Sequence, residues 1–568
     1  MTGSSASITS VSSAAARSTA CVPPVLSTSG AFATLDRPPC RLHGEWEGHS
    51  HYVGFAAHIV RLSCPTGAVK DRAESRRREL PAMFRNQMPR YEILSADAMA
   101  TLDAGWRRLV SELGVEFMSP RALDLLGEAG QKVEDHKVFF DPEWILEQVA
   151  KAPRSFDVQA RNPANSIHVG DDMMSFGAVY GPPFVREGEV RRDATMADFR
   201  NFTKLAQSFP ILDSAGGVIC EPNDTPLDSR HLDMTYALAT LTDKVFMGNV
   251  VSGPNARDTI ELASILFGAG QGREAGRASI DQTPATISLI NCNSPLRWDD
   301  RMLDALFQYA EANQAVVLTP FILMGAMSPV TIPAALVQQI AEALTGIALA
   351  QTIRPGCPVI FGSFLSNIDM QSGSPTFGTP ESGIGLLCTG QIARHFGLPF
   401  RSGGTLTSSQ VPDAQAGYEA LMTLLPTFLA GANWVMHSAG WLEGGLVAGY
   451  EKFIVDIELL QMMQVEFTPL EIDEASLAFD AHQEVGSGGH FLGAMHTMER
   501  FRTCFYRPLL SSSENYERWM RNGGNDAAGR AAKIWTERLE AYERPPLDEA
   551  VREEMEEYVV RRRKELGD

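Results

Sequence analysis

The chain has 568 residues, of which 44% are hydrophobic and 21% are charged, and its formal net charge at pH 7 is −20. This composition is that of a globular protein with a sizeable core, and the length allows one domain of about 250–350 residues with additions, or two or three ordinary domains. The acidic balance argues against nucleic-acid and anionic-membrane surfaces, because both need clustered Lys and Arg. No uncharged apolar run reaches the roughly 18 residues that a membrane span needs.

The eight cysteines are scattered along the chain, without a CxxC or another close pair. This usage is typical of a reducing compartment, and it excludes the usual zinc-finger spacings. Cys220 and Cys292 follow predicted strands and could share a zinc ion, but neither has a neighbouring Cys or His in a recognised spacing. We therefore expect a cytoplasmic protein without a metal site.

The first 90 residues differ from the rest of the chain. They open with MTGSSASITSVSSAAARSTA, which is rich in Ser and Ala and poor in acidic residues. Such a segment is typical of a disordered extension, of a start assigned too early, with Met83 or Met88 as the true beginning, or of a transit peptide. Sparse Arg and the lack of an amphipathic period favour the first two. Residues 91–170 then predict a helical preface, with Ser95 and Ser119 as N-caps.

Between residues 171 and 467, short apolar runs alternate with amphipathic helices. Eight strands are predicted, at 174–181, 211–220, 245–251, 285–293, 315–323, 358–364, 398–404 and 433–440. A predicted helix follows each of them, at 196–207, 229–242, 255–267, 299–313, 332–353, 381–396, 413–429 and 449–463. Eight such units predict an α/β protein with a (β/α)₈ TIM barrel. An open doubly wound sheet is the alternative, disfavoured because no GxGxxG opens a helix after a strand. Residues 468–568 predict a helical C-terminal extension that serves packing or assembly.

Candidate site residues lie at the carboxyl ends of the predicted strands, where the active site of such a barrel forms. Aromatic and acidic side chains at these positions could hold a quaternary ammonium cation. The same aromatic residues fit simple packing at the barrel top, and His437 fits a hydrogen-bonded core residue as well as a catalyst. His490 and His496 lie outside the eight units and are weaker candidates. The substrate-binding candidates are Tyr180, Phe184, Glu221, Phe364, Arg401, Trp441 and Glu443.

Ten segments in chain order resemble a known family. They are ARNPANSIHVG, GPPFVREG, RHLDMTYAL, FMGNVVSG, INCNSPLRWDDRMLDAL, TPFILMGAMSPVT, GSFLSNIDMQSGSPTFGTPE, RSGGTLTSSQVPDAQAGYE, HSAGWLEGGLVAGYEKF and GGHFLGAMHT. Over residues 91–532 the chain resembles the trimethylamine methyltransferase family, whose members move a methyl group from a methylated amine to a cobalt corrinoid carried by a partner protein. The resemblance implies a (β/α)₈ barrel, a small methylated amine as substrate, and cobalamin on a partner corrinoid protein rather than a tightly bound cofactor.

The loop TLTSSQVPDAQ after the seventh strand departs from part of this family. Its archaeal members that demethylate trimethylamine carry pyrrolysine in the corresponding segment, and here every position is an ordinary residue, with the closest placement near Ser409 and Gln410. Members without pyrrolysine include enzymes that demethylate glycine betaine, so the resemblance implies a quaternary amine as substrate. A quaternary ammonium that loses a methyl group leaves as a neutral tertiary amine, so no proton need be supplied.

The resemblance and the positions together suggest roles for the candidates. Ser409, Gln410 and His437 are the expected catalytic residues, and His437 could also hydrogen-bond a substrate carboxylate. Arg401 would bind that carboxylate in bidentate fashion, although a structural ion pair fits it equally well. The remaining expectations are a cage of Tyr180, Phe184, Phe364 and Trp441, charge balance from Glu221 and Glu443, and a mouth for the corrinoid lined by Gly403, Gly404 and Thr405.

Two other functions stay open from the sequence. One is a non-catalytic protein of the same fold that binds quaternary ammonium compounds, and the other is a different barrel enzyme, such as a lyase or a hydrolase. Methyl transfer to cobalamin would distinguish the first hypothesis from both. We also expect the chain to form a homo-oligomer, because acidic helical tails often help subunits to meet.

Overall fold

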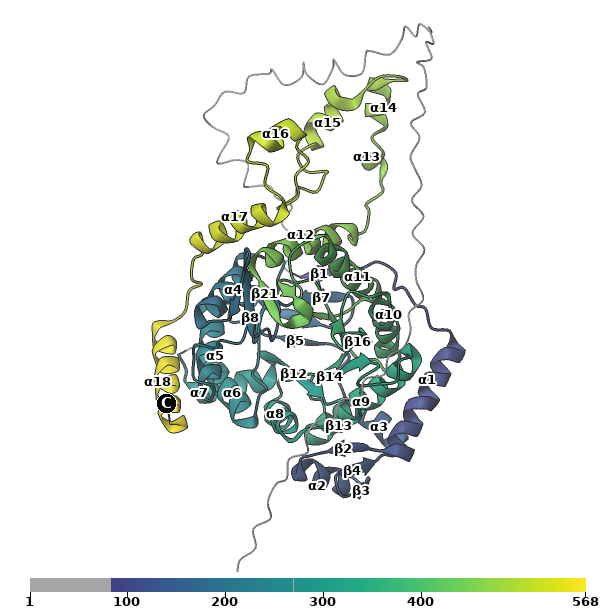
Figure 1. Cartoon of the computed structure of the whole chain (residues 1–568), viewed down its shortest axis with the longest axis vertical. Helices are drawn as coiled ribbons and strands as arrows, with labels where there is room; N and C mark the ends of the chain where they lie inside the picture. The colour runs from purple at the N-terminus through teal and green to yellow at the C-terminus, as the bar shows by residue number, and fades with distance from the viewer. Residues whose placement is uncertain (1–82, 269, 568) are drawn as a thin grey trace, which may run out of the picture. The chain divides into compact units, whose positions relative to one another are not determined.

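The computed structural model of the protein describes residues 83–268 and 270–567 (Figure 1). The predictions made for residues 1–82 lie outside the described residues. All elements named below belong to one compact unit, Ser75–Asp568.

A curled sheet of parallel strands forms the centre of this unit, and all eight predicted strands contribute to it. They are β7 (Met173–Phe176), β10 (Ser214–Gly216), β11 (Val245–Met247), β12 (Thr286–Cys292), β14 (Ala315–Met324), β15 (Val359–Gly362), β18 (Phe400–Gly403) and β19 (Trp434–Met436). Neighbours pair in the order β7-β19-β18-β15-β14-β12-β11-β10, always in parallel. A parallel bridge between Gly177 and Ser214 joins the two ends of this order. The carboxyl ends of all eight strands therefore share one edge.

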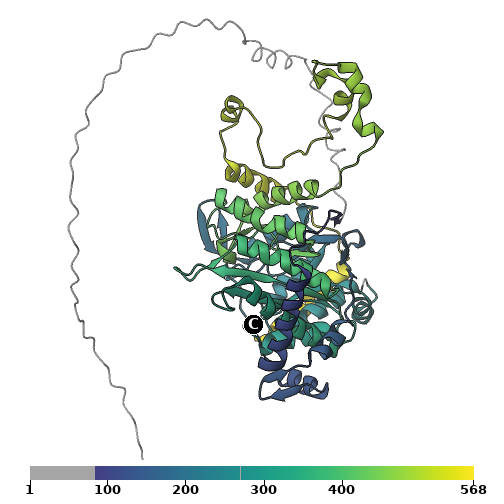
Figure 2. The same ribbon diagram turned by 90° about the vertical axis from the view of Figure 1, so that its right-hand side faces the viewer.

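Each strand is followed by a helix close to its predicted bounds, and these helices surround the sheet (Figures 1 and 2). They are α4 (Met196–Ser208), α5 (Arg230–Leu241), α6 (Gly253–Phe267), α8 (Asp300–Glu311), α9 (Ile332–Ile353), α10 (Pro380–His395), α11 (Ala414–Ala430) and α12 (Tyr450–Glu466). A further helix, α7 (Arg273–Gln282), follows α6. Only α9 among the described helices is long and apolar enough to cross a membrane, and 78% of its apolar window is buried inside the protein. It is therefore a core helix of the fold.

Side chains alternate along each strand between the helices and the inside of the curled sheet. The inward set forms its own apolar cluster, in which Val245, Ile287 and Ala315 lie near the amino ends of their strands. A hairpin of β5 (Phe156–Val158) and β6 (Ile167–Val169) packs against this cluster. The amino-terminal end of the interior is thus filled, so a ligand site has to form toward the carboxyl ends of the strands.

The segment predicted as a helical preface is mixed in structure, so that prediction needs correction. It contains α1 (Ala96–Arg108), α2 (Pro120–Glu128) and α3 (Pro142–Val149), but also the strands β2 (Val115–Phe117), β3 (Lys132–Glu134) and β4 (Lys137–Phe139). These strands form a sheet in the order β13-β2-β4-β3, with β13 (Arg297–Trp298) coming from the loop after β12. Val115 and Phe117 are buried on one side of β2, a period of two that a helical interpretation overlooks.

Two small additions at the carboxyl edge were not predicted. One is a four-stranded sheet of β8 (Phe184–Glu187), β9 (Val190–Asp193), β20 (Trp441–Leu442) and β21 (Val447–Gly449), in which β21 pairs with β8. The other is a hairpin of β16 (Phe364–Ile368) and β17 (Pro375–Thr376), in which β16 continues beside β14. Both bring loop residues over the ends of the central strands.

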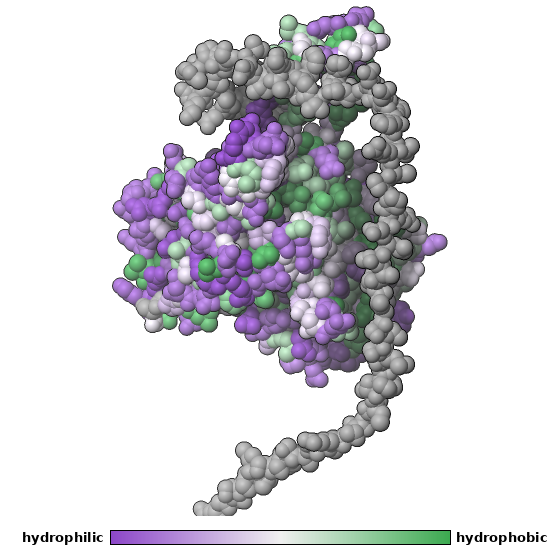
Figure 3. All heavy atoms as spheres, turned by 45° about the horizontal axis from the view of Figure 1, so that its top comes forward, coloured by the Kyte–Doolittle hydropathy of each residue, from purple (hydrophilic) through white to green (hydrophobic). Residues whose placement is uncertain are grey.

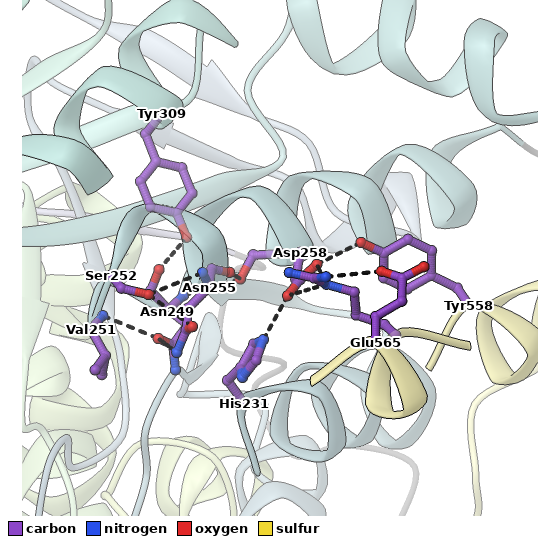
Figure 4. A network of polar contacts seen from close by, with 11 residues as sticks. His231, Asn249, Val251, Ser252, Asn255, Asp258, Tyr309, Tyr558 and Glu565 are labelled. Atoms are coloured by element: carbon purple, nitrogen blue, oxygen red, sulfur yellow. Dashed lines mark hydrogen bonds and ion pairs between the residues drawn. The ribbon is translucent and has the colours of Figure 1, made fainter. Parts of the chain in front are cut away.

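The C-terminal extension is helical, and its last two helices pack on the helices that surround the sheet. It comprises α13 (Glu474–Leu477), α14 (Phe479–Val485), α15 (Met495–Arg500), α16 (Tyr516–Arg521), α17 (Ala527–Glu540) and α18 (Glu549–Leu566). Asp258 of α6 fixes α18, because its carboxylate accepts hydrogen bonds from Tyr558 Oη at 2.7 Å and Arg562 Nε at 2.9 Å (Figure 4). His231 Nε2 of α5 lies 2.8 Å from the same carboxylate. This buried network joins three helices.

Candidate active site

Arg401 is the most unusual side chain at the carboxyl edge. Its neighbours Phe400 and Ser402 face the helices, where Ser402 Oγ lies 2.7 Å from Thr427 Oγ1 of α11, so Arg401 points into the sheet's interior. Arg401 is 1% exposed, and its Nη1 donates to Ser363 O at 2.7 Å. Nε and Nη2 have no hydrogen-bond partner, and no carboxylate among the described residues forms an ion pair with them. Burial lowers the pKa of Arg401, yet a guanidinium starts so far above neutrality that it remains a cation.

A buried cation with two unpaired hydrogen-bond donors needs an explanation. Buried unpaired donors are rare in native proteins, and each one lowers stability by about 1–3 kcal/mol. One hydroxyl inside the sheet shares this condition, because Thr319 Oγ1 of β14 is buried and unpartnered. Gly362 lets Thr319 pack directly against the neighbouring strand, because a Cβ at this position would lie 1.9 Å from Thr319 Oγ1. The arrangement suits a small anionic group that would accept from Arg401.

Aromatic rings lie next to this cation. The Arg401 Cζ atom is 5.5 Å from the centroid of the Phe364 ring, and Phe364 is 6.0 Å from Trp441 by ring centroids. Phe377 contacts both rings, at 5.5 Å from each. Trp441 is held in place because its Nε1 donates to Thr407 O at 3.1 Å. Ring faces attract cations, so this group of Phe364, Phe377 and Trp441, which we call the aromatic cluster, can hold an ammonium group.

His437 lies against the same cluster. Its ring is 4.5 Å from Trp441 and 5.9 Å from Phe364 by centroids. The backbone N–H of Tyr180 donates to His437 Nδ1 at 3.3 Å, so the neutral ring carries its proton on Nε2. Burial, together with the charge of Arg401, lowers the pKa of His437 well below its ordinary value. His437 is thus a neutral hydrogen-bond donor at pH 7, in a left-handed backbone conformation with φ 59°.

The two acidic candidates already have cationic partners. Glu221 binds Arg230 at 2.6 Å, and Glu443 binds Arg191 at 3.0 Å. The Arg191 guanidinium also lies 3.9 Å from the Phe184 ring centroid, so Phe184 and Glu443 form a separate group on the four-stranded sheet. Both carboxylates are therefore already in ion pairs. These contacts give no support to the prediction that free carboxylates balance the charge of a bound ammonium group.

Most of the Gly, Ser and Thr residues after β18 are buried, so their packing gives no support to the expected open mouth, which stays a prediction. A Cβ on Gly404 would lie 2.6 Å from Ser438 Cα, and Thr405 N donates to His437 O at 2.9 Å. Small residues here allow the loop after β18 to pack against the loop after β19. Gly403, the last residue of β18, is buried as well. Through Thr405 and Thr407, the loop thereby holds His437 and Trp441 in position.

The side chains of Ser409 and Gln410 bond within their own loop and to the start of α11, and not to Arg401. Ser409 Oγ donates to Asp413 Oδ1 at 2.9 Å, and Asp413 caps α11. Gln410 is exposed, and its Nε2 donates to Ser408 O at 3.2 Å. These bonds explain the Ser-rich stretch as the start of a helix, and the catalytic roles of both residues stay predictions.

Three surface hollows lie away from this site. Hollows of about 640, 430 and 410 Å³ are lined by residues of other regions, such as Met99, Leu125 and Leu547. Within residues 83–268 and 270–567, no three His, Cys, Asp or Glu residues are placed to share a metal ion. Cys220 and Cys292 are buried, and burial raises the pKa of both thiols.

Sequence reasoning missed Phe377 and undervalued Phe321. Phe321 stacks on Phe364 with centroids 5.0 Å apart, and it stands on β14 beside Phe364 on β16. Its position at a strand end was a usable signal. Phe377 follows the short hairpin β16–β17, and nothing in its local pattern indicates that the chain folds back there. His490 and His496, the weaker candidates, lie in the C-terminal extension and are exposed and half-buried.

Comparison with known proteins identifies the family of the chain. The family model for trimethylamine methyltransferase matches residues 66–567. The chain is 39% identical over 482 residues to a glycine betaine methyltransferase from Desulfitobacterium hafniense strain Y51, covering 85% of this chain and 99% of the relative. It is 27% identical to the trimethylamine methyltransferase MttB of D. hafniense strain DCB-2, over 80% of this chain and 90% of that one. It is 26% identical to the proline betaine:corrinoid methyltransferase of Eubacterium limosum, over 80% and 94%.

These matches establish the family, which the sequence segments indicated. The chain belongs to the trimethylamine methyltransferase family.

Proposed function

We propose that the protein removes a methyl group from a quaternary amine that carries a carboxylate, such as glycine betaine, and transfers it to the corrinoid of a partner protein. The observation that carries this proposal is Arg401, a buried cation whose two unpartnered donors lie beside the aromatic cluster. Two of the relatives are named for betaines, which combine a quaternary ammonium with a carboxylate. Both halves of such a substrate would find a matching group in this site.

The residues divide the work of binding between the two ends of the substrate. Arg401 Nε and Nη2 would donate to the carboxylate, and charge-assisted bonds of this type are about twice as strong as neutral ones. Phe364, Phe377 and Trp441 would surround the trimethylammonium, with an attraction of about 0.5–2 kcal/mol for each well-placed ring. Neutral His437 could add a hydrogen bond from Nε2. A carboxylate in this place would also satisfy the donors that the free protein leaves unpaired.

The chemistry needs no acid or base from the chain. When the C–N bond breaks, its electron pair stays on nitrogen, and the product is a neutral tertiary amine. The reduced corrinoid supplies the electron pair that forms the new bond to the methyl carbon. Catalysis by the protein would therefore consist of positioning the methyl group and excluding water. Among residues 83–268 and 270–567, no carboxylate forms an ion pair with Arg401 and His437 is neutral, which is consistent with this chemistry.

The eight parallel strands, with the bridge from Gly177 to Ser214 between the first and last of them, support a (β/α)₈ barrel as the scaffold. In such barrels the carboxyl edge carries the active site, and Arg401, Phe364 and His437 all lie at that edge. A corrinoid protein would have to approach from the same side. We expect the reaction to take place in the cytoplasm, and the roles of Gly403, Gly404, Thr405, Ser409 and Gln410 toward the corrinoid remain proposals.

A methyl-transfer assay tests this function. Purified protein, cob(I)alamin and glycine betaine are expected to give the absorption spectrum of methylcob(III)alamin, and proline betaine, carnitine, choline and trimethylamine form the comparison set. Betaines should react and trimethylamine should not. Binding of betaine without any methylcobalamin, even with a cognate corrinoid protein, would instead favour a binding protein. Hydrolysis or elimination products that form without cobalamin would favour a lyase or hydrolase.

A further inference from the structure

The C-terminal extension contains a segment without a core of its own. We call residues 470–505 the arm; it includes α13, α14 and α15, which stand off from the helices around the sheet (Figures 1 and 2). Within the arm only Ala481 and Ala494 are buried. Ten large apolar side chains are exposed, from 42% to 83%: Leu470, Ile472, Leu477, Phe479, Phe491, Leu492, Met495, Met498, Phe501 and Phe505. Helices of four to seven residues are unstable alone, so the arm needs a surface to cover it.

Both ends of the arm are attached to α12. The arm begins shortly after this helix ends at Glu466, and the chain returns at Glu458, whose side chain is 4% exposed. The Glu458 carboxylate accepts hydrogen bonds from Tyr506 Oη, Leu509 N and Leu510 N, at 3.1, 2.7 and 3.1 Å. The arm is therefore a loop anchored at its two ends, and its apolar residues are presented at a defined place.

A second apolar surface without cover lies on α11. The solvent side of this helix carries no charge, because Glu419 is half-buried and bonded to Thr407 Oγ1. Its outward residues recur at helical spacing: Ala414, Gly417, Tyr418, Leu421, Met422 and Leu425. Ile384 of α10 and Met462 and Val465 of α12 are exposed on the two adjacent helices. A helix that is apolar on both sides is normally buried on both. We call this surface the α10–α12 face, and Figure 3 shows hydrophobic residues gathered there.

We propose that two copies of the chain form a dimer in which the arm of each copy covers the α10–α12 face of the other. One chain carries both uncovered surfaces, so a two-fold axis can pair each arm with a face and leave neither open. Ten side chains exposing about 100 Å² each supply about 1,000 Å² per copy, and a stable interface needs about 800 Å² per partner.

The apolar character favours a second copy over a partner that comes and goes. Permanent homodimer interfaces are more hydrophobic than those of transient complexes. A corrinoid protein must leave between turnovers, and its departure would expose the arm and the face to water and to aggregation. The corrinoid protein is also expected at the carboxyl edge of the strands, which the arm and the face do not form.

Light scattering of the full chain during gel filtration tests the dimer. One chain has a mass of 62.0 kDa, and we expect twice that mass at micromolar concentration. An arm variant, Phe479→Asp with Leu492→Asp, and a face variant, Leu421→Asp with Met422→Asp, should each run as a single chain with an unchanged circular dichroism spectrum. Val560→Asp, on the exposed side of α18, is the matched control and should remain a dimer.

Mixing the two variants identifies which surfaces meet. A dimer of arm variant and face variant retains one intact contact, between the normal arm of one chain and the normal face of the other. We therefore expect a mixed two-chain species when one variant carries a fluorescent label, although each variant alone stays monomeric. A monomeric wild type, either variant remaining dimeric, or a mixture without a two-chain species would overturn the proposal.

Discussion

Replacing Arg401 by Met should remove the contribution of the substrate's carboxylate to the binding free energy. The contribution of its trimethylammonium group should remain. Met has a similar volume but no charge and no N–H. A hydrogen bond to a charged group contributes about 1.5–3 kcal/mol, so the loss of even one bond to the carboxylate should weaken glycine betaine binding by about 10- to 150-fold. Choline has the same trimethylammonium and no carboxylate, so its affinity should stay within about threefold. Titration calorimetry measures both.

The same substitution should spare the free protein. Arg401 makes one hydrogen bond, to Ser363 O at 2.7 Å, and leaves Nε and Nη2 unpaired. Because each buried unpaired donor costs about 1–3 kcal/mol, the free energy of unfolding of Arg401→Met should be equal to that of the wild type or higher. Arg354→Met, which breaks a remote pair with Asp281, is the control and should bind betaine normally. Betaine affinity unchanged in Arg401→Met, or a stability loss above about 3 kcal/mol, would refute the reasoning.

Three further substitutions test other parts of the account. Trp441→Leu should weaken betaine and choline alike, by about 5- to 30-fold in calorimetry, since it removes a cation-binding ring; an effect on betaine alone would contradict this. Lys452→Met should lower the free energy of unfolding in urea by about 3–5 kcal/mol, because it leaves the buried carboxylate of Asp456, 2.5 Å away, without its partner; a double variant with Asp456→Leu should recover much of that loss. Partial burial disfavours the charge of His168, but hydrogen bonds to two flanking Asp side chains raise its pKa. The stabilisation of the fold by charged His168 is thus fully present below about pH 6.5 and is lost as the pH rises through the raised pKa. His168→Gln should therefore lower the free energy of unfolding by up to about 1 kcal/mol at low pH and leave it unchanged near pH 9. A difference between variant and wild type that is the same at every pH would contradict this prediction.

Much of the fold could be predicted because its signals are local. The run AVVLTPFILM of β14 is apolar on both sides, as a central parallel strand must be, and its neighbouring helices have clear caps, such as Asp299, whose side chain accepts from Met302 N at 2.9 Å. The β8–β9 hairpin was missed because FVRE carries charges at two of its four positions and VRRD at three of its four. Those charges are tolerated because the hairpin lies at the surface. No local sequence pattern indicates this position.

Some features of the site could likewise be predicted from local patterns, and others depend on tertiary pairing. Arg401 and Phe364 stand at strand ends, so the repeat pattern alone brings them to one edge. The pairing of Glu443 with Arg191 depends on β21 and β8 lying side by side, and these segments are more than 240 residues apart in the chain. Tertiary pairing therefore decided which candidates remain free for a substrate. The buried loop at Gly404 is a similar case, since a Gly-rich stretch fits close packing as well as an open mouth.

A crystal structure with glycine betaine bound would test the central claim most directly. The account predicts the carboxylate within hydrogen-bond distance of Arg401 Nε and Nη2, and the trimethylammonium among Phe364, Phe377 and Trp441 with one methyl group toward the carboxyl edge of the strands. Betaine bound elsewhere, or held with its carboxylate away from Arg401, would contradict it.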